Sequence, residues 1–134
     1  MTELLKPGLY SPEGTADAPT HPALIGGACT CGHVFFPMQA YGCEKCGSTA
    51  IVPRLLSGRG RLIASSRVHL HAGKGREAPF TVGSILLDDG PMVRTLLADA
   101  PVSPVAGQRV HTLLVPVADA SGAPRFDLRF APDN

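Results

Sequence analysis

The chain has 134 residues, and 12 lysines and arginines against 11 aspartates and glutamates give it a formal net charge of +1. A charge so close to balance argues against a partner held by bulk electrostatics, such as nucleic acid or an anionic membrane surface. No apolar run approaches the ~20 residues needed to cross a bilayer, and the N-terminal residues lack the layout of a secretion signal. We therefore expect a cytoplasmic protein, in which clustered cysteines bind metal more often than they form disulfides.

Thirteen prolines and fifteen glycines punctuate the chain every few residues. This spacing leaves little room for long helices and favours short strands joined by turns, so we expect an all-β fold. Residues 1–21 are predicted to be an extended arm that has no core of its own and docks on a partner. Residues 22–50 are predicted to form a zinc ribbon, and residues 51–134 a barrel.

All four cysteines lie in two close pairs, Cys29 with Cys31 and Cys43 with Cys46. Each pair is followed by a glycine, whose backbone can adopt a positive φ and turn an N–H toward a thiolate. Two such turns suit one tetrahedral ion, and zinc is the expected ion for four sulfurs because it is redox-inert and prefers this geometry. We predict that these four cysteines hold one zinc.

The first pair is unusual, because one residue rather than two separates its cysteines. In an extended segment, Cys29 and Cys31 point to the same side and can still reach one ion. His33 is an alternative ligand, and iron is an alternative to zinc. Disulfides or four free thiols are the remaining interpretations of this stretch.

The second half of the chain has the pattern of short strands. Strands are expected at residues 62–70, 80–87, 92–98, 108–117 and 124–130, with a turn or bulge at residues 58–61 and a hairpin at Asp88-Asp89-Gly90-Pro91. Five strands with an interruption between the third and the fourth are typical of an OB-fold barrel. A small β-sandwich would give a similar pattern.

A metal ribbon followed by a five-stranded barrel resembles one family, the OB-fold, rubredoxin-like zinc-ribbon family associated with acyl-CoA enzymes (domain of unknown function thirty-five). The resemblance covers residues 22–132 and rests on short segments: residues 24–27, 31–37 and 43–48 in the ribbon, and residues 57–60, 78–80, 87–90, 107–110 and 129–132 in the barrel. Two features depart from the family. Ala28 stands where the family has its first cysteine, and a proline-rich arm replaces an amphipathic helical segment.

The resemblance implies a role in an enzyme assembly. Family members are typically small partner subunits of thiolase-superfamily enzymes, which include acyl-CoA thiolases, hydroxymethylglutaryl-CoA synthase assemblies, aldolases and acyltransferases. The resemblance therefore implies a zinc-containing accessory subunit of a hetero-oligomer that acts on acyl-CoA thioesters. The chain is not expected to be catalytic alone; its partner carries the catalytic residues, and it helps to form the coenzyme A site.

Four cationic residues are candidates for contact with the phosphates of coenzyme A. Lys74 and Arg76 lie in a glycine-bearing loop, and Arg59 and Arg61 flank Gly60. Lysine and arginine pair with phosphate, and glycine allows close backbone approach. The alternative is a solvated loop without a ligand. His69 and His71 share one face of an expected strand and are read as surface or interface groups rather than as an acid–base or metal pair.

The main rival function is binding of single-stranded nucleic acid, which OB barrels and zinc ribbons often perform. That function needs a basic groove and a row of stacking aromatic side chains. The chain has no tryptophan, two tyrosines and five phenylalanines, and Phe80 is the only aromatic residue in the first three expected barrel strands. We therefore rank nucleic-acid binding second, and a free-standing iron electron carrier third.

Overall fold

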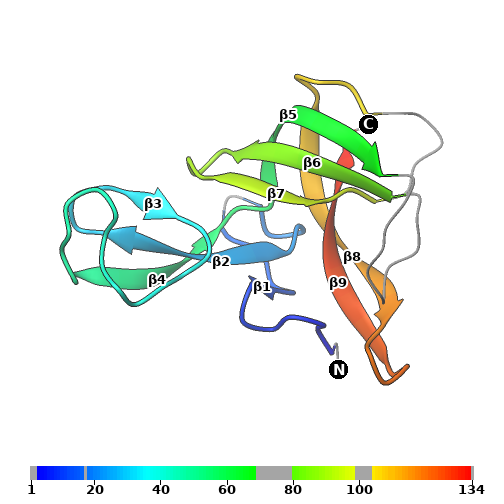
Figure 1. The fold of residues 1–134 in the computed structure, drawn as a ribbon, viewed down its shortest axis with the longest axis horizontal. Coiled ribbons are helices and arrows are strands. Elements are labelled where there is room, and N and C mark those ends of the chain that lie inside the picture. The colour runs from blue at the N-terminus through cyan, green and yellow to red at the C-terminus, as the bar shows by residue number, and fades with distance from the viewer. Residues whose placement is uncertain (1–2, 17, 69–79, 99–103, 134) are drawn as a thin grey trace.

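The computed structural model describes residues 3–16, 18–68, 80–98 and 104–133. Over these ranges every regular element is a strand, and the strands form two antiparallel sheets (Figure 1). The described residues contain no helix that is long and apolar enough to span a membrane. The predicted all-β fold is confirmed.

The first sheet is built around β2. Its strands are β1 (Tyr10–Ser11), β2 (Ala23–Cys29), β3 (Val34–Phe35) and β4 (Ile51–Leu56). β4 pairs with nearly the whole of one edge of β2, while β1 and β3 share its other edge. Gly27 allows this close packing, because a side chain there would collide with the Phe35 ring. In Figure 1, β2, β3 and β4 project to one side of the molecule.

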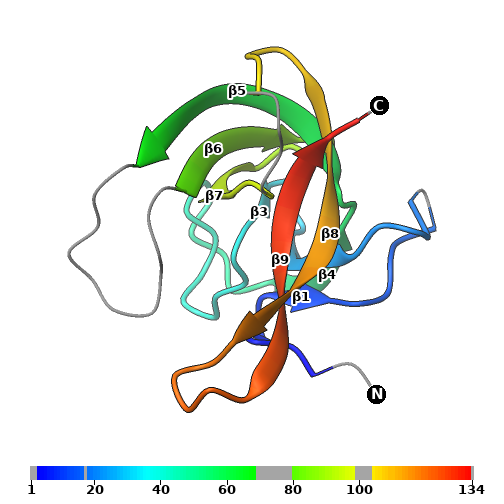
Figure 2. The same cartoon turned by 90° about the vertical axis from the view of Figure 1, so that its right-hand side faces the viewer.

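The second sheet contains five strands in the order β7-β6-β5-β8-β9. They are β5 (Arg59–Val68), β6 (Phe80–Leu87), β7 (Met92–Leu96), β8 (Arg109–Ala118) and β9 (Pro124–Pro132). A register shift between Leu62 and Ala64 bends β5, and the sheet curls until a parallel bridge joins Leu97 to Phe130 (Figure 2). Counted from β5, this order is 3-2-1-4-5 with the third and fifth strands meeting, which is the topology of an OB-fold.

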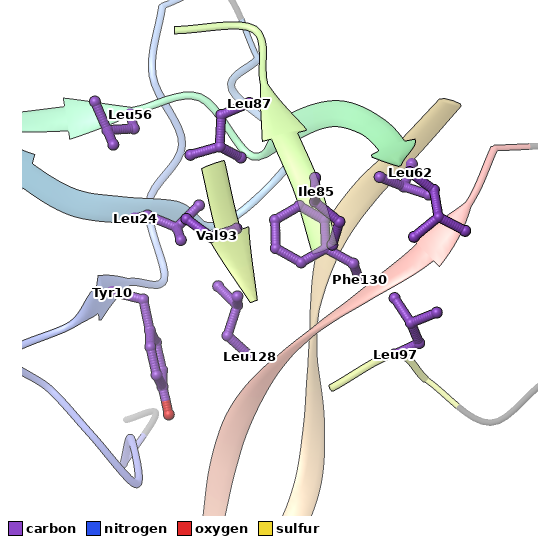
Figure 3. Packing of buried hydrophobic residues seen from close by; sticks show 11 residues of the cluster. Tyr10, Leu24, Leu56, Leu62, Ile85, Leu87, Val93, Leu97, Leu128 and Phe130 are labelled. Atoms are coloured by element: carbon purple, nitrogen blue, oxygen red, sulfur yellow. The ribbon is translucent and has the colours of Figure 1, made fainter. Parts of the chain in front are cut away.

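Both sheets contribute to one hydrophobic core. The inward residues of the barrel strands, among them Leu62, Ile85, Val110 and Phe130, are fully buried. Leu24 of β2 and Tyr10 of β1 belong to the same cluster, and Figure 3 shows Tyr10 standing beside Leu128. The N-terminal segment therefore packs on the chain's own barrel, and its predicted docking on a partner stays a prediction.

A two-residue connection joins the sheets. β4 ends at Leu56 and β5 begins at Arg59. The backbone N–H and Oγ of Ser57 donate to Oδ1 of Asp89 in the β6–β7 turn, at 3.0 and 2.8 Å. The Gly58 carbonyl accepts from the Thr112 N–H, and a side chain at Gly58 would collide with Thr112 Oγ1. Residues of β6–β7 and β8 thus hold the connection from two directions.

The barrel strands agree closely with the predicted ones, with one correction. The expected turn or bulge at residues 58–61 is wrong, because Arg59, Gly60 and Arg61 are the first residues of β5 and pair in regular register, and the register shift of that strand comes only after Leu62. Gly60 is needed where β5 approaches β6, since a side chain would lie 2.6 Å from the Leu86 carbonyl oxygen. The hairpin at residues 88–91 is present, and Gly90 adopts a φ of 120°. The boundaries at residues 21 and 50 stay predictions.

Candidate metal centre

The first cysteine pair is formed by a turn. Cys29 is the last residue of β2, and its carbonyl accepts from the Gly32 N–H at 2.9 Å. Gly32 has a φ of 97°, and the chain then returns so that the His33 carbonyl accepts from the Cys29 N–H at 2.9 Å. Cys31 lies inside this turn. The two cysteines meet because the chain reverses, and not because the segment is extended.

The second pair lies on a similar turn. The Cys43 carbonyl accepts from the Gly47 N–H at 2.8 Å, and the Cys43 N–H donates to the Ser48 carbonyl at 2.8 Å. Gly47 has a φ of 77°, as expected for the glycine that follows a knuckle. The N–H of Lys45 points at the Cys43 sulfur, 3.4 Å away. This backbone donor stabilises negative charge on that sulfur.

The two turns bring all four sulfurs within 4.8 Å of one another. The Sγ atoms of Cys29 and Cys46 are 3.5 Å apart, and those of Cys31 and Cys43 are 3.7 Å apart. Sulfurs at ~2.3 Å from a central zinc occupy the corners of a tetrahedron with edges of ~3.8 Å. The observed distances fit that geometry, and all four cysteines are free thiols. The cluster can therefore hold a metal ion such as zinc.

The protonation states of the second pair differ. A hydrogen bond from the backbone of Cys46 lowers the pKa of the Cys43 thiol to about 6. The backbone of Ser48 lowers the pKa of Cys46, but hydrogen bonds shared with the other cysteines and burial outweigh it and raise that pKa to about 12. The backbone donors around this pair thus favour a thiolate, and a bound metal ion would require deprotonated sulfurs at all four positions.

His33, the alternative ligand, is not a member of the sulfur cluster. Its Nε2 lies 2.8 Å from Oε1 of Glu44, and its ring stacks on Phe35 with centroids 5.7 Å apart. These contacts join the first knuckle to the second. Beside them, a cavity of about 610 Å³ separates the ribbon from the β6–β7 turn, and its lining includes Cys31, Lys45 and Met92.

The predicted coenzyme A residues fall into two groups. Arg59 and Arg61 lie on β5 with exposed side chains, and neither forms an ion pair with another described residue. Both lower the pKa of Asp88, although the hydrogen bond from Arg109 has the larger effect. Lys74 and Arg76 lie outside the described residues, as do His69 and His71.

Tyr10, Asp127 and Arg129 form a buried polar cluster that was not predicted from the sequence. The hydroxyl of Tyr10 donates to Oδ1 of Asp127 at 2.8 Å, and Arg129 Nη1 pairs with the other carboxylate oxygen. Burial raises the pKa of Tyr10, and the bond to Asp127 raises it further, to about 12. A cavity of about 290 Å³ adjoins this cluster. The signal available in the sequence was Tyr10 together with Leu4, Leu5 and Leu9, which are large apolar residues in an arm otherwise rich in proline, glycine and polar residues.

Three comparisons with known proteins agree with this architecture. Residues 54–114 match the family model OB_ChsH2_C, described as the C-terminal OB-fold domain of ChsH2. A DUF35 domain-containing scaffold protein of Pyrococcus furiosus is 35% identical over 77 residues, which are 57% of this chain and 56% of that protein. The chain thus aligns with little more than half the length of this relative.

A solved structure, the Ltp2-ChsH2(DUF35) aldolase, has a similar fold. The TM-score is 0.65 at 21% sequence identity, and the match covers 82% of this chain and 84% of that chain. The likeness extends beyond the barrel, because β5 to β9 span only residues 59–132 and the match covers 82% of the chain.

Proposed function

We propose that this chain, which resembles the DUF35 family of OB-fold proteins, is a non-catalytic accessory subunit of a thiolase-like enzyme complex acting on acyl-CoA thioesters. Two names support this proposal. The Pyrococcus relative is called a scaffold protein, and the solved structure of similar fold is called an aldolase with ChsH2 and Ltp2 in its name. As part of the same proposal, the complex is cytoplasmic, where the four thiols stay reduced.

The observation that carries the proposal is the outer face of β5, β6 and β7. Arg61, Leu86 and Met92 stand opposite one another in the strand registers and form one row across three strands. Leu86 is 41% exposed and Met92 55% exposed, and Arg59 lies two residues before Arg61. Apolar side chains beside free guanidinium groups suit a protein partner that carries a phosphorylated ligand at its edge.

In this proposal Arg59 and Arg61 pair with the phosphates of coenzyme A, and Lys74 and Arg76 add to the same charge. Arginine presents a planar fork of donors that matches phosphate oxygens. The thioester end of the ligand then points into the partner, which supplies the catalytic residues. This chain positions the nucleotide end of the ligand.

The proposed zinc has a structural role. Cys29, Cys31, Cys43 and Cys46 would provide a complete four-sulfur set, which leaves no open position for water or substrate. A bound ion would cross-link the two turns, whose nearest cysteines in sequence, Cys31 and Cys43, are 12 residues apart. The ribbon has few core residues of its own, so metal binding contributes most of its stability.

Co-expression with a thiolase-superfamily subunit encoded beside this chain tests the proposal. We expect a stable hetero-oligomer by size-exclusion chromatography with light scattering, and coenzyme A binding by that complex in calorimetry. The double variant Arg59→Gln, Arg61→Gln should weaken coenzyme A binding by roughly tenfold, because each exposed ion pair contributes up to about 1 kcal/mol. Arg54→Gln, an exposed arginine on β4, is the matched control and should have no effect.

Three results would contradict this function. The first is a chain that forms no complex with such a subunit and instead binds single-stranded nucleic acid at physiological salt. The second is thioester cleavage by the isolated chain. The third, unchanged coenzyme affinity in the double arginine variant, would remove the outer face of β5 from the coenzyme site.

A further inference from the structure

The two edge strands of the barrel sheet meet at one end only. Leu97 forms a parallel bridge with Phe130, and the Ala98 N–H donates to the Phe130 carbonyl at 2.8 Å. Away from this bridge β7 and β9 diverge, and we call the gap between Arg94–Leu96 of β7 and Leu128 of β9 the β7–β9 seam. Figure 3 shows Leu128 and Tyr10 below Val93 of β7.

The direction of the backbone groups follows from the hydrogen bonds at each end of β7. Leu97 donates its N–H to Thr81, and Pro91 accepts with its carbonyl from Leu87, so the odd-numbered residues of β7 face β6. Ala98 donates in the opposite direction, to β9. Because backbone groups alternate along a strand, the N–H and C=O of Arg94 and Leu96 point into the seam. The Leu97–Phe130 bridge engages the Leu96 carbonyl. No further bridge between β7 and β9 is found among the described residues, so the N–H and C=O of Arg94 and the N–H of Leu96 remain for an added strand.

The same reasoning applies to β9. The Phe126 N–H donates to the Glu3 carbonyl, and the Phe126 carbonyl accepts from the Leu5 N–H, each at 2.8 Å. The Phe130 carbonyl faces Ala98 in the same direction. Leu128 lies between Phe126 and Phe130, so its backbone groups also face the seam. One end of the seam is therefore already filled by an extended piece of chain, which pairs with β9 in parallel at Phe126.

The open part of the seam coincides with the cavity of about 290 Å³. Its apolar lining comes from both sheets and includes Leu9, Leu24, Phe36 and Val82. Three cations also line it, Lys6, Arg94 and Arg129, against one carboxylate, Asp127. Asp127 is already paired with Arg129, whereas Lys6 and Arg94 form no ion pair with another described residue. The seam therefore combines free backbone groups, apolar walls and unbalanced positive charge.

These features select one kind of occupant. Free strand edges accept an added strand, and apolar pockets beside them bind alternate side chains of that strand. A second copy of β7 would place Arg94 near Arg94, and like charges across a strand pair are destabilising. An extended segment with an acidic residue has the opposite sign and matches the seam.

We propose that an extended segment of the partner subunit, apolar at alternate positions and carrying an acidic residue, docks in the β7–β9 seam as an added strand on the free edge of β7. The proposed function supplies the identity of the partner, so this inference rests on it. The backbone geometry supplies the site.

Two variants at one position separate the contributions to this docking. Arg94→Pro removes the N–H that faces the seam, and proline is tolerated on an edge strand at such a position. Arg94→Gln keeps that N–H and removes the charge. In the complex with the thiolase-superfamily subunit, Arg94→Pro should raise the dissociation constant by roughly tenfold or more, and Arg94→Gln by less. Thermal unfolding of each variant alone shows whether the barrel is intact.

Amide exchange measured by NMR gives a second readout that needs no variant. On forming the complex, the amides of Arg94 and Leu96 should gain protection, while those of Val93 and Thr95, already bonded to β6, should change little. Unchanged exchange at Arg94 and Leu96, or unchanged affinity in a folded Arg94→Pro variant, would overturn the inference while the proposed function stands. Protection at these amides that rises with the concentration of this chain alone would identify a second copy as the occupant and also overturn it. Failure to form any complex would overturn both.

Discussion

Replacing Tyr10 with phenylalanine should destabilise the protein, although Tyr10 lies in the N-terminal segment far from the barrel in sequence. The side chain is only 4% exposed, and its hydroxyl bonds to Asp127 Oδ1 at 2.8 Å and to the Phe126 carbonyl at 3.1 Å. The substitution keeps the ring and removes both of these bonds, and also the bond that the hydroxyl accepts from the Lys6 N–H at 3.2 Å. A hydrogen bond to a charged group contributes about 1.5–3 kcal/mol, so we expect a loss of about 2 kcal/mol.

This loss converts into a measurable change in melting temperature. With an unfolding entropy of about 2.1 cal/mol/K per residue over 134 residues, 2 kcal/mol lowers the midpoint by about 7 °C. Calorimetry at pH 7 measures the change, and Tyr41→Phe, at a fully exposed tyrosine, is the control. The double variant with Asp127→Asn should lose less than the sum of the two single variants, because both remove the same bond.

The pH dependence gives an independent check on Tyr10. Its pKa in the folded protein is raised to about 12 from an ordinary value of 10.0, so its contribution to stability is complete below pH 10 and is lost as the pH rises toward 12. The Tyr10→Phe variant should lack this alkaline loss. A midpoint unchanged from that of the parent protein would refute the view that the N-terminal segment is part of the core.

Two further predictions concern the metal centre and acid stability. Purified protein should contain close to one zinc per chain by elemental analysis, and Cys46→Ser should lose the metal and the amide protection of β2 and β3; a metal-free protein with a disulfide between any two cysteines would contradict this. Stability should fall as the pH drops below 3.8, because the pKa values of Asp88 and Asp127 are lowered in the folded protein. A hydrogen bond from Arg109 lowers the pKa of Asp88, and for Asp127 the bonds from Arg129 and Tyr10 outweigh the opposing effect of burial. The stabilisation from both carboxylates is present above pH 3.8 and is lost when they are protonated. Acid titration followed by circular dichroism measures this, and a transition unaffected by Asp127→Asn would count against the assignment.

The sequence predicted those parts of the fold that depend on local signals. Alternating apolar residues located the barrel strands, the Asp-Gly pair located the β6–β7 turn, and the spacing of four cysteines located the cluster. Gly60 misled the prediction, because a glycine that permits close strand packing looks the same in sequence as a glycine in a turn. The role of Tyr10 was not predictable, since its partner Asp127 is 117 residues away and no local pattern records such a contact.

The candidate site was predictable to a similar extent. Residue types and spacing located the four cysteines that form the sulfur cluster, and the roles of Arg59 and Arg61 at a coenzyme site stay predictions. The open seam beside β7 had no sequence signal, because the free edge is a consequence of how far the sheet curls. Strand order can be inferred from pattern, but the distance between the first and last strands of a curled sheet depends on a bend at Leu62–Ala64.

The connection at Ser57 and Gly58 determines how the molecule moves. Two residues are held by Asp89 on one side and by Thr112 on the other, between the cysteine-bearing sheet and the barrel. We therefore expect the two sheets to reorient as a single body with a nearly constant angle between them. A partner that touches both sheets must be complementary to that angle, and inserting a flexible residue after Gly58 would disturb assembly without altering either surface.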